Sequence, residues 1–369
     1  MLALRVGYEK LQRETGWEPR VSWEEGIART IAWYASDRER WSGRVDWLGR
    51  RGHQDVTEPT FDVSPCPVCE ADDAIVVHRI VYGSDGVLES LQISERPRAM
   101  LLRCCRCGHH FARPQITAVA LASYYSGLGS ELFTEPGNDA AEVARARFLV
   151  GAIERWTQGG RILDVGCGRG ELLREFDPLR WERIGIEPFP IVDVEETASA
   201  GVTVVRGLLD DVSLPESSFD VVVAIDLLEH LRGARTFAHR VRSLVRDEGL
   251  VVVVTGDISS FFARLFGARW GYFGSWEHVS FFTPSSIQYL FKNAGFTVVE
   301  NRRISHDQRI RGIHSFFVLA APIAAKNIVK RALNLARPSH PYKIRAYPLL
   351  FDHMLVVARA THEPSPAQP

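Results

Sequence analysis

The chain has 369 residues, of which 46% are hydrophobic and 24% are charged, and its formal net charge is -1. This composition is typical of a globular protein of about two domains, and the absence of a basic excess argues against nucleic acid as a partner. Charged residues interrupt the N-terminal segment, which excludes a signal peptide, and the longest apolar run, 316–325, is too short to cross a bilayer.

These features predict a cytoplasmic location by default. The six cysteines are then expected to be free thiols or metal ligands rather than disulfides.

Residues 1–50 are predicted to form a small helical appendage. Ser22 and Glu25 fit a capping box at the start of a helix. One apolar face follows, formed by Trp23, Ile27, Ile31 and Tyr34. Residues 51–64 are polar and contain proline, so they are expected to be a linker.

Residues 63–115 carry two cysteine pairs with the spacing of metal-binding knuckles: Cys66 and Cys69, then Cys104 and Cys107. Four thiolates form a closed tetrahedral shell for zinc, which stabilises a segment too small for its own core. The site is therefore predicted to be structural. Thiol pairs without metal, or a redox pair, are the alternatives, and Cys105 is expected to be a bystander.

A helical connector is predicted at 116–160, and residues 161–360 then alternate between short apolar runs and helix-like segments. The predicted strands are 161–165, 183–187, 202–205, 219–225, 249–255, 296–300 and 353–360. This alternation predicts an α/β doubly wound sheet, mostly parallel, with helices on both faces. An apolar and basic insert occupies 311–350, and the tail 361–369 is expected to be disordered.

The stretch RILDVGCGRGELLREF places Asp164, Gly166 and Gly168 between the first of these strands and a helix. Such a turn lets the backbone approach a ligand closely, although a tight strand-to-helix turn alone would also explain it. Glu187 ends the next strand about twenty residues later, where a carboxylate can accept hydrogen bonds from ribose hydroxyls.

LDVGCGRG, GIEP, LPESSFDVVVAIDLLEHL and HVSFFTPSSIQYLFKNAGF, in this order, resemble the successive motifs of class I S-adenosylmethionine (SAM)-dependent methyltransferases over about 145–305. The resemblance implies an antiparallel last strand and SAM as cofactor. Gly166 and Gly168 would pass under its methionine part, Asp164 would hold the loop, and Glu187 would bind the ribose.

The resemblance places 208–211 beside the adenine. Relatives often have an acidic residue where this chain has Leu208, so Asp210 or Asp211 is expected to supply that contact, unless backbone amides suffice. Asp226, at the end of the fourth strand, is also assigned to the cofactor site.

Methyl transfer requires a positioned acceptor and a base for its proton. His278 and His230 are the candidate catalytic bases, since both follow strands at the ligand-binding edge; a loop cap or hydrogen bond is the alternative role. Asp226, Glu229 and His230 also form D-x-x-E-H, which is similar to a motif with which some quinone-pathway methyltransferases hold a divalent ion, although most proteins with Glu-His at this place need no metal.

An N-terminal zinc ribbon before this domain resembles the architecture of sugar methyltransferases. Residues 8–41 resemble the C-terminal end of a dTDP-glucose 4,6-dehydratase, but the Tyr-x-x-x-Lys catalytic domain is absent. A fusion remnant, a mis-chosen start site or a docking appendage would each explain this segment.

The expected function is therefore methyl transfer from SAM to a small-molecule acceptor, a nucleotide-linked sugar or glycan intermediate. The alternatives are a catalytically silent, zinc-clipped scaffold and, by N-terminal resemblance only, a nucleotide-sugar dehydratase or epimerase. The insert 311–350 is expected either to rest on a membrane surface or to pack on the core or a dimer partner. The sequence leaves the oligomeric state open.

Overall fold

The computed structural model describes residues 25, 61–80, 98–128, 139–189, 194–305 and 351–361. The chain divides into two units, Met1–Glu58 and Pro59–Pro369. Apart from residue 25, the predicted helical appendage lies outside the described residues, as do the insert 311–350 and the tail beyond residue 361. The elements below all belong to the second unit. Within the described residues, no helix is long and apolar enough to span a membrane.

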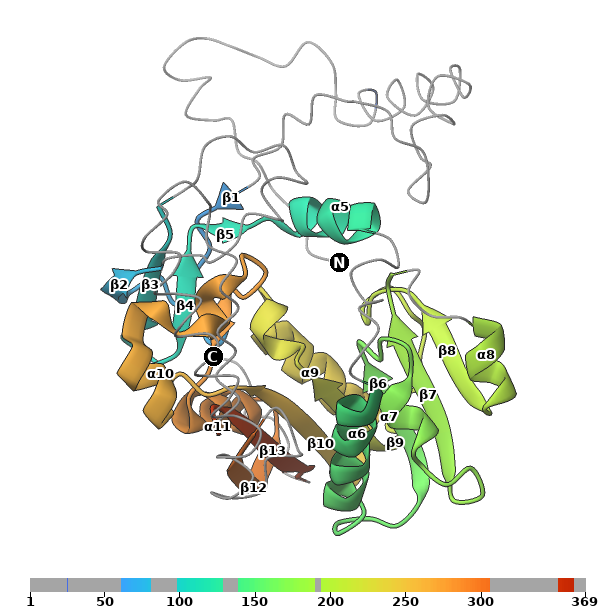
Figure 1. Cartoon of the computed structure of the whole chain (residues 1–369). Coiled ribbons are helices and arrows are strands. Elements are labelled where there is room, and N and C mark those ends of the chain that lie inside the picture. Colours follow the sequence, from blue (N-terminus) through green and yellow to red (C-terminus); the bar gives the residue numbers. More distant parts are fainter. Residues whose placement is uncertain are drawn as a thin grey trace. The chain divides into compact units, whose positions relative to one another are not determined.

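A seven-stranded sheet forms the centre of this unit, in the order β12-β13-β10-β9-β6-β7-β8 (Figure 1). Neighbouring strands from β10 to β8 are parallel, and β13 is antiparallel to both of its neighbours. The strands are β6 (Gly160–Val165), β7 (Trp181–Glu187), β8 (Val202–Arg206), β9 (Phe219–Ile225), β10 (Val245–Gly256), β12 (Phe296–Ile304) and β13 (His353–Ala360).

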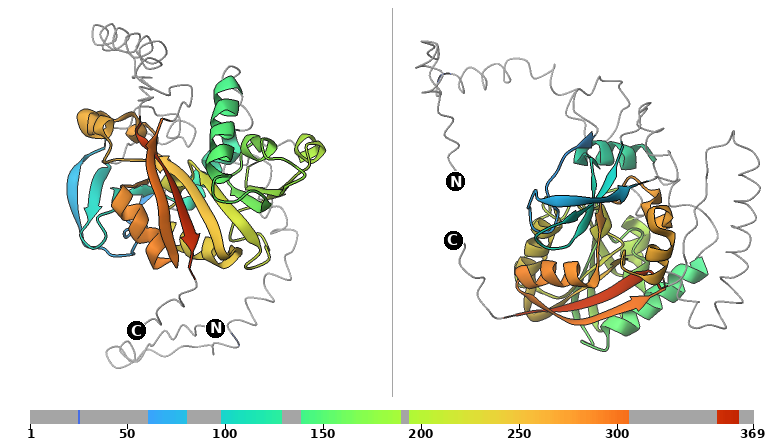
Figure 2. Two further views of the ribbon diagram at one scale, coloured as in Figure 1. Left: turned by 90° about the horizontal axis from the view of Figure 1, so that it is seen from below. Right: turned by 90° about the vertical axis from the view of Figure 1, so that its left-hand side faces the viewer.

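The predicted doubly wound, mostly parallel sheet with an antiparallel last strand is therefore confirmed. The chain runs outward through β6, β7 and β8, and then returns to β9 on the other side of β6. Figure 2 shows β13 (red) between β12 (orange) and β10 (yellow). The strand predicted at 249–255 begins earlier, at Val245, because a bulge before Leu250 admits the polar residues between them.

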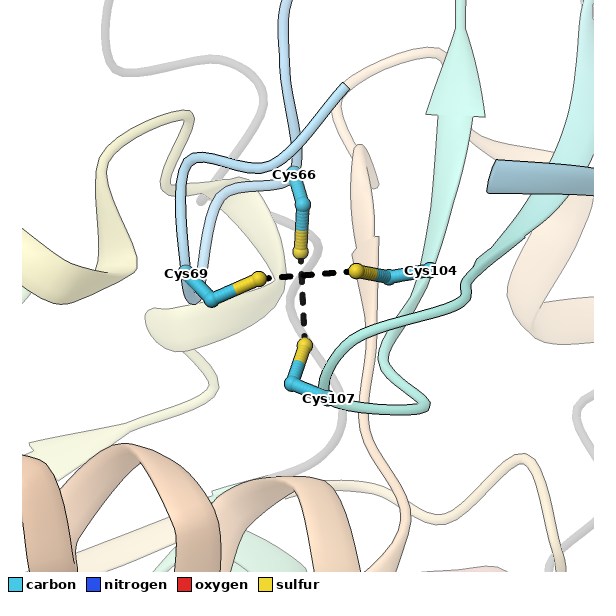
Figure 3. Close-up of side chains that lie close together, drawn as sticks. All are labelled: Cys66, Cys69, Cys104 and Cys107. Atoms are coloured by element: carbon cyan, nitrogen blue, oxygen red, sulfur yellow. Dashed lines mark hydrogen bonds between the residues drawn. The ribbon is translucent and has the colours of Figure 1, made fainter. Parts of the chain in front are cut away.

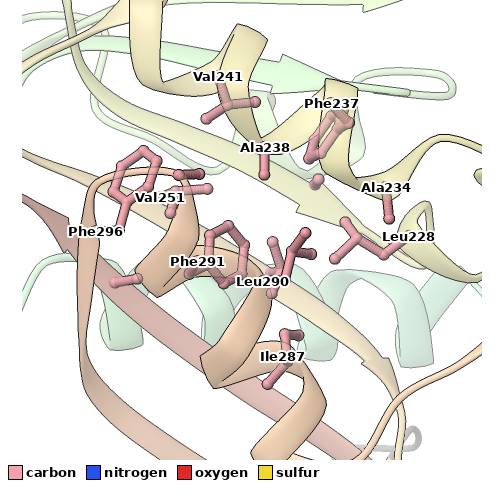
Figure 4. Packing of buried hydrophobic residues seen from close by; sticks show 14 of the residues in the cluster. Leu228, Ala234, Phe237, Ala238, Val241, Val251, Ile287, Leu290, Phe291 and Phe296 are labelled. Atoms are coloured by element: carbon pink, nitrogen blue, oxygen red, sulfur yellow. The ribbon is translucent and has the colours of Figure 1, made fainter. Parts of the chain in front are cut away.

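Helices cover both faces of the sheet because successive residues of its strands point to opposite sides. Val221 and Val223 of β9 pack with α6 (Asp139–Ile153) and α7 (Glu171–Arg174). Val222 and Ala224 belong to the other cluster, with α9 (Ala234–Leu244) and α11 (Pro284–Asn293) (Figure 4). The remaining helix of this sheet, α8 (Val194–Ser199), lies between β7 and β8 in the chain.

A second, small sheet has the order β11-β4-β3-β2. Three of its strands come from the cysteine-bearing segment: β2 (Ala74–Arg79), β3 (Met100–Cys104) and β4 (His110–Arg113). The fourth, β11 (Ser280–Phe281), comes from the methyltransferase-like part of the chain. The short pair β1 (Phe61–Asp62) and β5 (Gln115–Ile116) and the helix α5 (Ala118–Leu128) complete this segment.

The aromatic stretch before β11 packs against the small sheet. It consists of α10 (Phe261–Phe266) and two short 3-10 helices, η3 (Gly267–Arg269) and η4 (Gly271–Gly274). Trp270, Phe273 and Trp276 are at most 3% exposed, in one cluster with Leu101 and Ala112. The small sheet therefore supports the segment that leads to His278.

We predict that Gly185→Ala destabilises the protein. A Cβ there would lie 2.5 Å from the sulfur of Cys167 and 3.2 Å from Cδ1 of Leu173. Overpacking of this kind lowers the free energy of unfolding by about 1–3 kcal/mol, measured by urea denaturation. Gly151→Ala in α6 is the control, because its Cβ would meet nothing within 4 Å and alanine favours a helix. Equal stability of the two variants would contradict the prediction.

Candidate functional site

The glycine turn begins where β6 ends. Gly166 and Gly168 have φ angles of 76° and 55°, a region in which other residues are strained. The N–H groups of Gly166 and Cys167 both donate to the carbonyl of Ile186, at 2.8 and 3.1 Å, so the turn is fixed against β7. Cys167 is buried against Gly185, which supports a packing role for it.

Glu187, the last residue of β7, is held against this turn. One of its carboxylate oxygens accepts the N–H of Gly168 at 3.0 Å, and the other accepts the N–H of Phe189 at 3.1 Å. Burial raises the pKa of Glu187, and the two N–H donors oppose that effect. The carboxylate is therefore oriented before any ligand arrives.

Asp164 lies beneath the turn and is 3% exposed. Its Oδ1 is buried and has no hydrogen-bond partner within the described part of the chain. Burial, with the charges of Glu187 and Glu171, raises the pKa of Asp164 to about 8. A buried carboxylate oxygen without a donor is a place where a cationic or hydrogen-bond-donating ligand gains stability, and the ammonium and sulfonium groups of SAM fit that description.

The predicted adenine-contacting segment follows β8. The N–H of Gly207 donates to the carbonyl of Glu187 at 3.2 Å, which places this segment beside the end of β7. Leu208, Asp210 and Asp211 are all exposed. The adenine contact therefore stays a prediction, with either carboxylate accessible to a ligand.

Asp226 lies at the end of β9 and has a positive φ of 49°. Its N–H donates to the carbonyl of Val254 at 2.9 Å, and its Oδ2 pairs with Arg145 of α6 at 2.5 Å. The helix around Arg145 was predicted, but the ion pair was not. Asp226 thus joins α6 to the edge of the sheet, and a direct role in holding the cofactor stays a prediction.

The structure brings the two predicted catalytic histidines together. His230 lies in the 3-10 helix η2 (Leu228–His230), and its ring meets that of His278 edge to face, with centroids 4.8 Å apart and an interplanar angle of 74°. Glu229 lies with them: one atom from each of the three side chains could bind a metal ion, and these atoms lie within 4.8 Å of one another. His278 replaces Asp226 in the constellation that D-x-x-E-H suggested.

The protonation of this trio follows from its contacts. His278 Nδ1 lies 2.7 Å from the carbonyl of Tyr272, so Nδ1 carries the proton and Nε2 is left as the basic nitrogen. Burial lowers the pKa of both histidines and raises that of Glu229, which also accepts a hydrogen bond from Thr255 Oγ1 at 2.9 Å. The trio can hold a divalent cation or accept a proton from an acceptor.

Tyr272 was not singled out in the sequence. It lies in the aromatic stretch, and its hydroxyl accepts the N–H of Gly256 at 2.9 Å and also bonds Glu229. Its ring lies 4.3 Å from that of His278. A tyrosine among six nearby aromatic residues carries no local signal that marks it as part of a site.

The four predicted metal ligands converge on one point (Figure 3). Cys66 and Cys107 sulfurs are 3.6 Å apart, and those of Cys69 and Cys104 are 3.4 Å apart. A tetrahedral zinc with bonds of ~2.3 Å needs sulfurs roughly 3.8 Å apart, so the donor set fits the ion with small shifts. Cys105 is exposed and lies outside the cluster, as expected for a bystander.

The backbone around the second cysteine pair also has the geometry of a metal-binding knuckle. Gly108 has a φ of 72°, and its N–H donates to the carbonyl of Cys104 at 3.0 Å. The hydrogen bond with Cys107 lowers the pKa of Cys66 to about 6, despite burial. Burial raises the pKa of Cys69 to about 11, so loss of protons from the set would be coupled to binding of the ion.

Comparisons with known proteins agree with the central sheet. Residues 140–301 match the model of a methyltransferase domain family. The chain is 30% identical over 154 residues to a ubiquinone biosynthesis O-methyltransferase of Azorhizobium caulinodans, covering 39% of this chain and 61% of that protein. A protein of the same name from Rhodopseudomonas palustris is 29% identical over 152 residues, which cover 38% of this chain and 60% of that protein. The chain thus spans about three fifths of these relatives' length.

Among solved structures, a SAM-dependent methyltransferase of Thermotoga maritima, a possible histamine N-methyltransferase, is 17% identical, with a TM-score of 0.39 over 59% of this chain and 92% of that chain. A phosphoethanolamine N-methyltransferase of Haemonchus contortus in complex with SAM is 15% identical, with a TM-score of 0.39. The match covers 68% of this chain and 63% of that chain. The family match, the sheet order and the glycine turn agree in giving this part of the chain the fold of a class I methyltransferase.

Proposed function

We propose that the protein transfers a methyl group from SAM to a hydroxyl group of a small-molecule acceptor. The observation that carries the proposal is the turn at Gly166 and Gly168, with Glu187 fixed beside it and the unpartnered Asp164 oxygen beneath it. SAM is a ligand that combines a close backbone approach, a ribose that a carboxylate can bind, and donor groups for a buried, unpartnered carboxyl oxygen.

Each residue has a distinct part in this proposal. Glu187 would accept hydrogen bonds from the ribose, and Asp164 would hold the loop and the cationic part of SAM. SAM supplies an already activated methyl group on its sulfonium. The protein must therefore mainly orient the acceptor oxygen and remove its proton. His230, His278 and Glu229, on the acceptor side of the site, are the residues that would do this.

The acceptor class is the finer part of the proposal. The cysteine-bearing segment and the resemblance of residues 8–41 to a dTDP-glucose 4,6-dehydratase favour a nucleotide-linked sugar or glycan. The names of the similar proteins from Azorhizobium and Rhodopseudomonas instead suggest a quinone precursor. A screen with dTDP-glucose and catechol, with tritiated methyl transfer as readout, separates the two classes.

We also propose that Cys66, Cys69, Cys104 and Cys107 hold a structural zinc ion. Their sulfurs close a four-coordinate shell, so the ion would have no open position for chemistry. Its part would be to hold the small sheet, on which the His278 segment packs.

Glu187→Ala should weaken SAM binding at least about tenfold, ~1.4 kcal/mol, because the ribose loses its carboxylate partner. Isothermal titration calorimetry with SAM and S-adenosylhomocysteine measures it. Glu182→Ala is the control, since Glu182 lies on the same strand but points to solvent. A folded wild-type protein that binds neither ligand would favour the silent-scaffold alternative.

His278→Gln should leave SAM affinity unchanged and reduce kcat by about 10²-fold or more, because the trio loses its basic Nε2. If the trio holds a cation, Mn²⁺ binding followed by electron paramagnetic resonance should also disappear in Glu229→Gln. His239→Gln on the exposed side of α9 is the control. Unaltered kcat in His278→Gln would refute a role for the trio.

The purified protein should contain about one zinc per chain by mass spectrometry of the metal, and Cys104→Ser should lose it and unfold at a lower temperature. Cys105→Ser is a matched control in the same CCRC run, because Cys105 is exposed and outside the cluster. Zinc retained in Cys104→Ser would contradict the assignment.

A further inference from the structure

One edge of the small sheet has no neighbouring strand among the described residues. The sheet runs in the order β11-β4-β3-β2, so β2 (Ala74–Arg79) pairs with β3 on one side only. Figure 1 shows β2 (blue) at the outer margin of this sheet. The outward backbone N–H and C=O groups of such a strand can pair with a further strand. The proposed methyl transfer gives this edge no role.

The side chains of β2 make this edge apolar. Ile75, Val76 and Val77 are consecutive β-branched residues, and they are 48%, 59% and 46% exposed. Because neighbouring side chains of a strand point to opposite faces of the sheet, Ile75 and Val76 make both faces apolar beside the edge. β-Branched residues favour strand pairing, and an exposed apolar edge strand is a site of association with another strand.

The edges of the described sheets differ in how far they are protected from such pairing. Charged side chains, short strands and bulges are the usual protection. At the two ends of the central sheet, β12 carries three charged residues, and β8 exposes the polar Thr203 and Arg206. At the other end of the small sheet, β11 has only two residues. In β2 a bulge at Val77 interrupts the pairing with β3, and it leaves the apolar side chains exposed.

The two ends of β2 carry opposite charges. Asp72 and Asp73 precede the strand and Arg79 ends it, and all three residues are exposed. Asp72 also lies 3.9 Å from Arg113 Nη2, so Asp73 is the acidic residue better placed to meet another chain. When two copies of β2 run antiparallel, the acidic end of each lies beside the basic end of the other. Opposite charges across strands stabilise pairing, and this edge is therefore complementary to itself.

We propose that β2 pairs antiparallel with β2 of a second copy of this chain, about a two-fold axis. The two four-stranded sheets then form one continuous sheet, and the symmetry makes the contact between Asp73 and Arg79 of the second copy occur twice. A strand of six residues is roughly 20 Å long. Such a contact buries less area than an obligate dimer does, so the dimer is reversible and depends on protein concentration.

Sedimentation velocity of the zinc-loaded full chain tests the dimer, and we expect a monomer–dimer equilibrium that shifts with protein concentration. Val76→Lys should leave only monomer, because the two lysines would meet near the two-fold axis. Leu179→Lys is the matched control, since it adds the same charge at a leucine that is 93% exposed and lies outside the small sheet. A wild type that is monomeric at every concentration, or a dimer that persists in Val76→Lys, would show that the proposal is wrong.

Charge reversal tests the antiparallel arrangement. Asp73→Arg and Arg79→Asp should each weaken dimerisation by about threefold or more, because each places like charges opposite one another at two symmetric positions. The double variant restores opposite charges and should dimerise as the wild type does. Zinc content is measured for each variant, because Asp73 adjoins Cys105 in the CCRC run. A zinc-replete double variant that dimerises no better than the single variants would exclude this pairing.

Hydrogen exchange separates pairing between copies from pairing within one chain. In the wild type, exchange at Ala74–Arg79 should slow as the protein concentration rises, because the dimer hydrogen-bonds the outward N–H groups of β2. Exchange in β12 should not change with concentration. Slow exchange at every amide of Ala74–Arg79 in the monomer would mean that another part of the chain covers this edge. That result would refute a second copy as its partner.

Discussion

The pairing of β11 with β4 is the contact on which the acceptor side of the site depends. Ser280 lies opposite Phe111 and Phe281 opposite His110, so two residues from the methyltransferase domain complete the small sheet. On the other side, the N–H of Val279 donates to the carbonyl of Glu229, and Ser280 Oγ donates to that of Leu231. The segment that carries His278 is thus fixed between the cysteine cluster and the loop after β9.

This arrangement explains why so many ionisable groups can be buried at one edge. Asp164, Glu187, Glu229 and Asp352 are each at most 5% exposed, and each would be costly to bury alone. Backbone N–H groups hold Glu187, Thr255 and Tyr272 hold Glu229, and Trp270 and His353 hold Asp352. Of these four side chains, Asp164 alone keeps an oxygen without a partner among the described residues, directly under the turn where the cofactor is expected.

The parts predicted from the sequence were those with local signals. The strands of the central sheet follow from apolar runs, the turn from three spaced glycines, and the cysteine set from two short motifs, and the structure confirms the fold. The parts that were missed join residues far apart in the chain: Arg145 with Asp226, β4 with β11, and Asp352 and His353 with Tyr272. Neither periodicity nor spacing reports such contacts, because they arise from tertiary packing.

The position of β13 has a consequence for how the chain assembles during synthesis. Its only partners are β10 and β12, and β12 has no other neighbour in the sheet. The pairing of β10 with β13 joins residues about a hundred positions apart, and contacts of such long range form slowly. Until His353–Ala360 leaves the ribosome, β12 has no strand to pair with and the edge of β10 stays unpaired. The half of the domain that carries α11 and β12 would therefore be the last to assemble and the half most in need of chaperone protection.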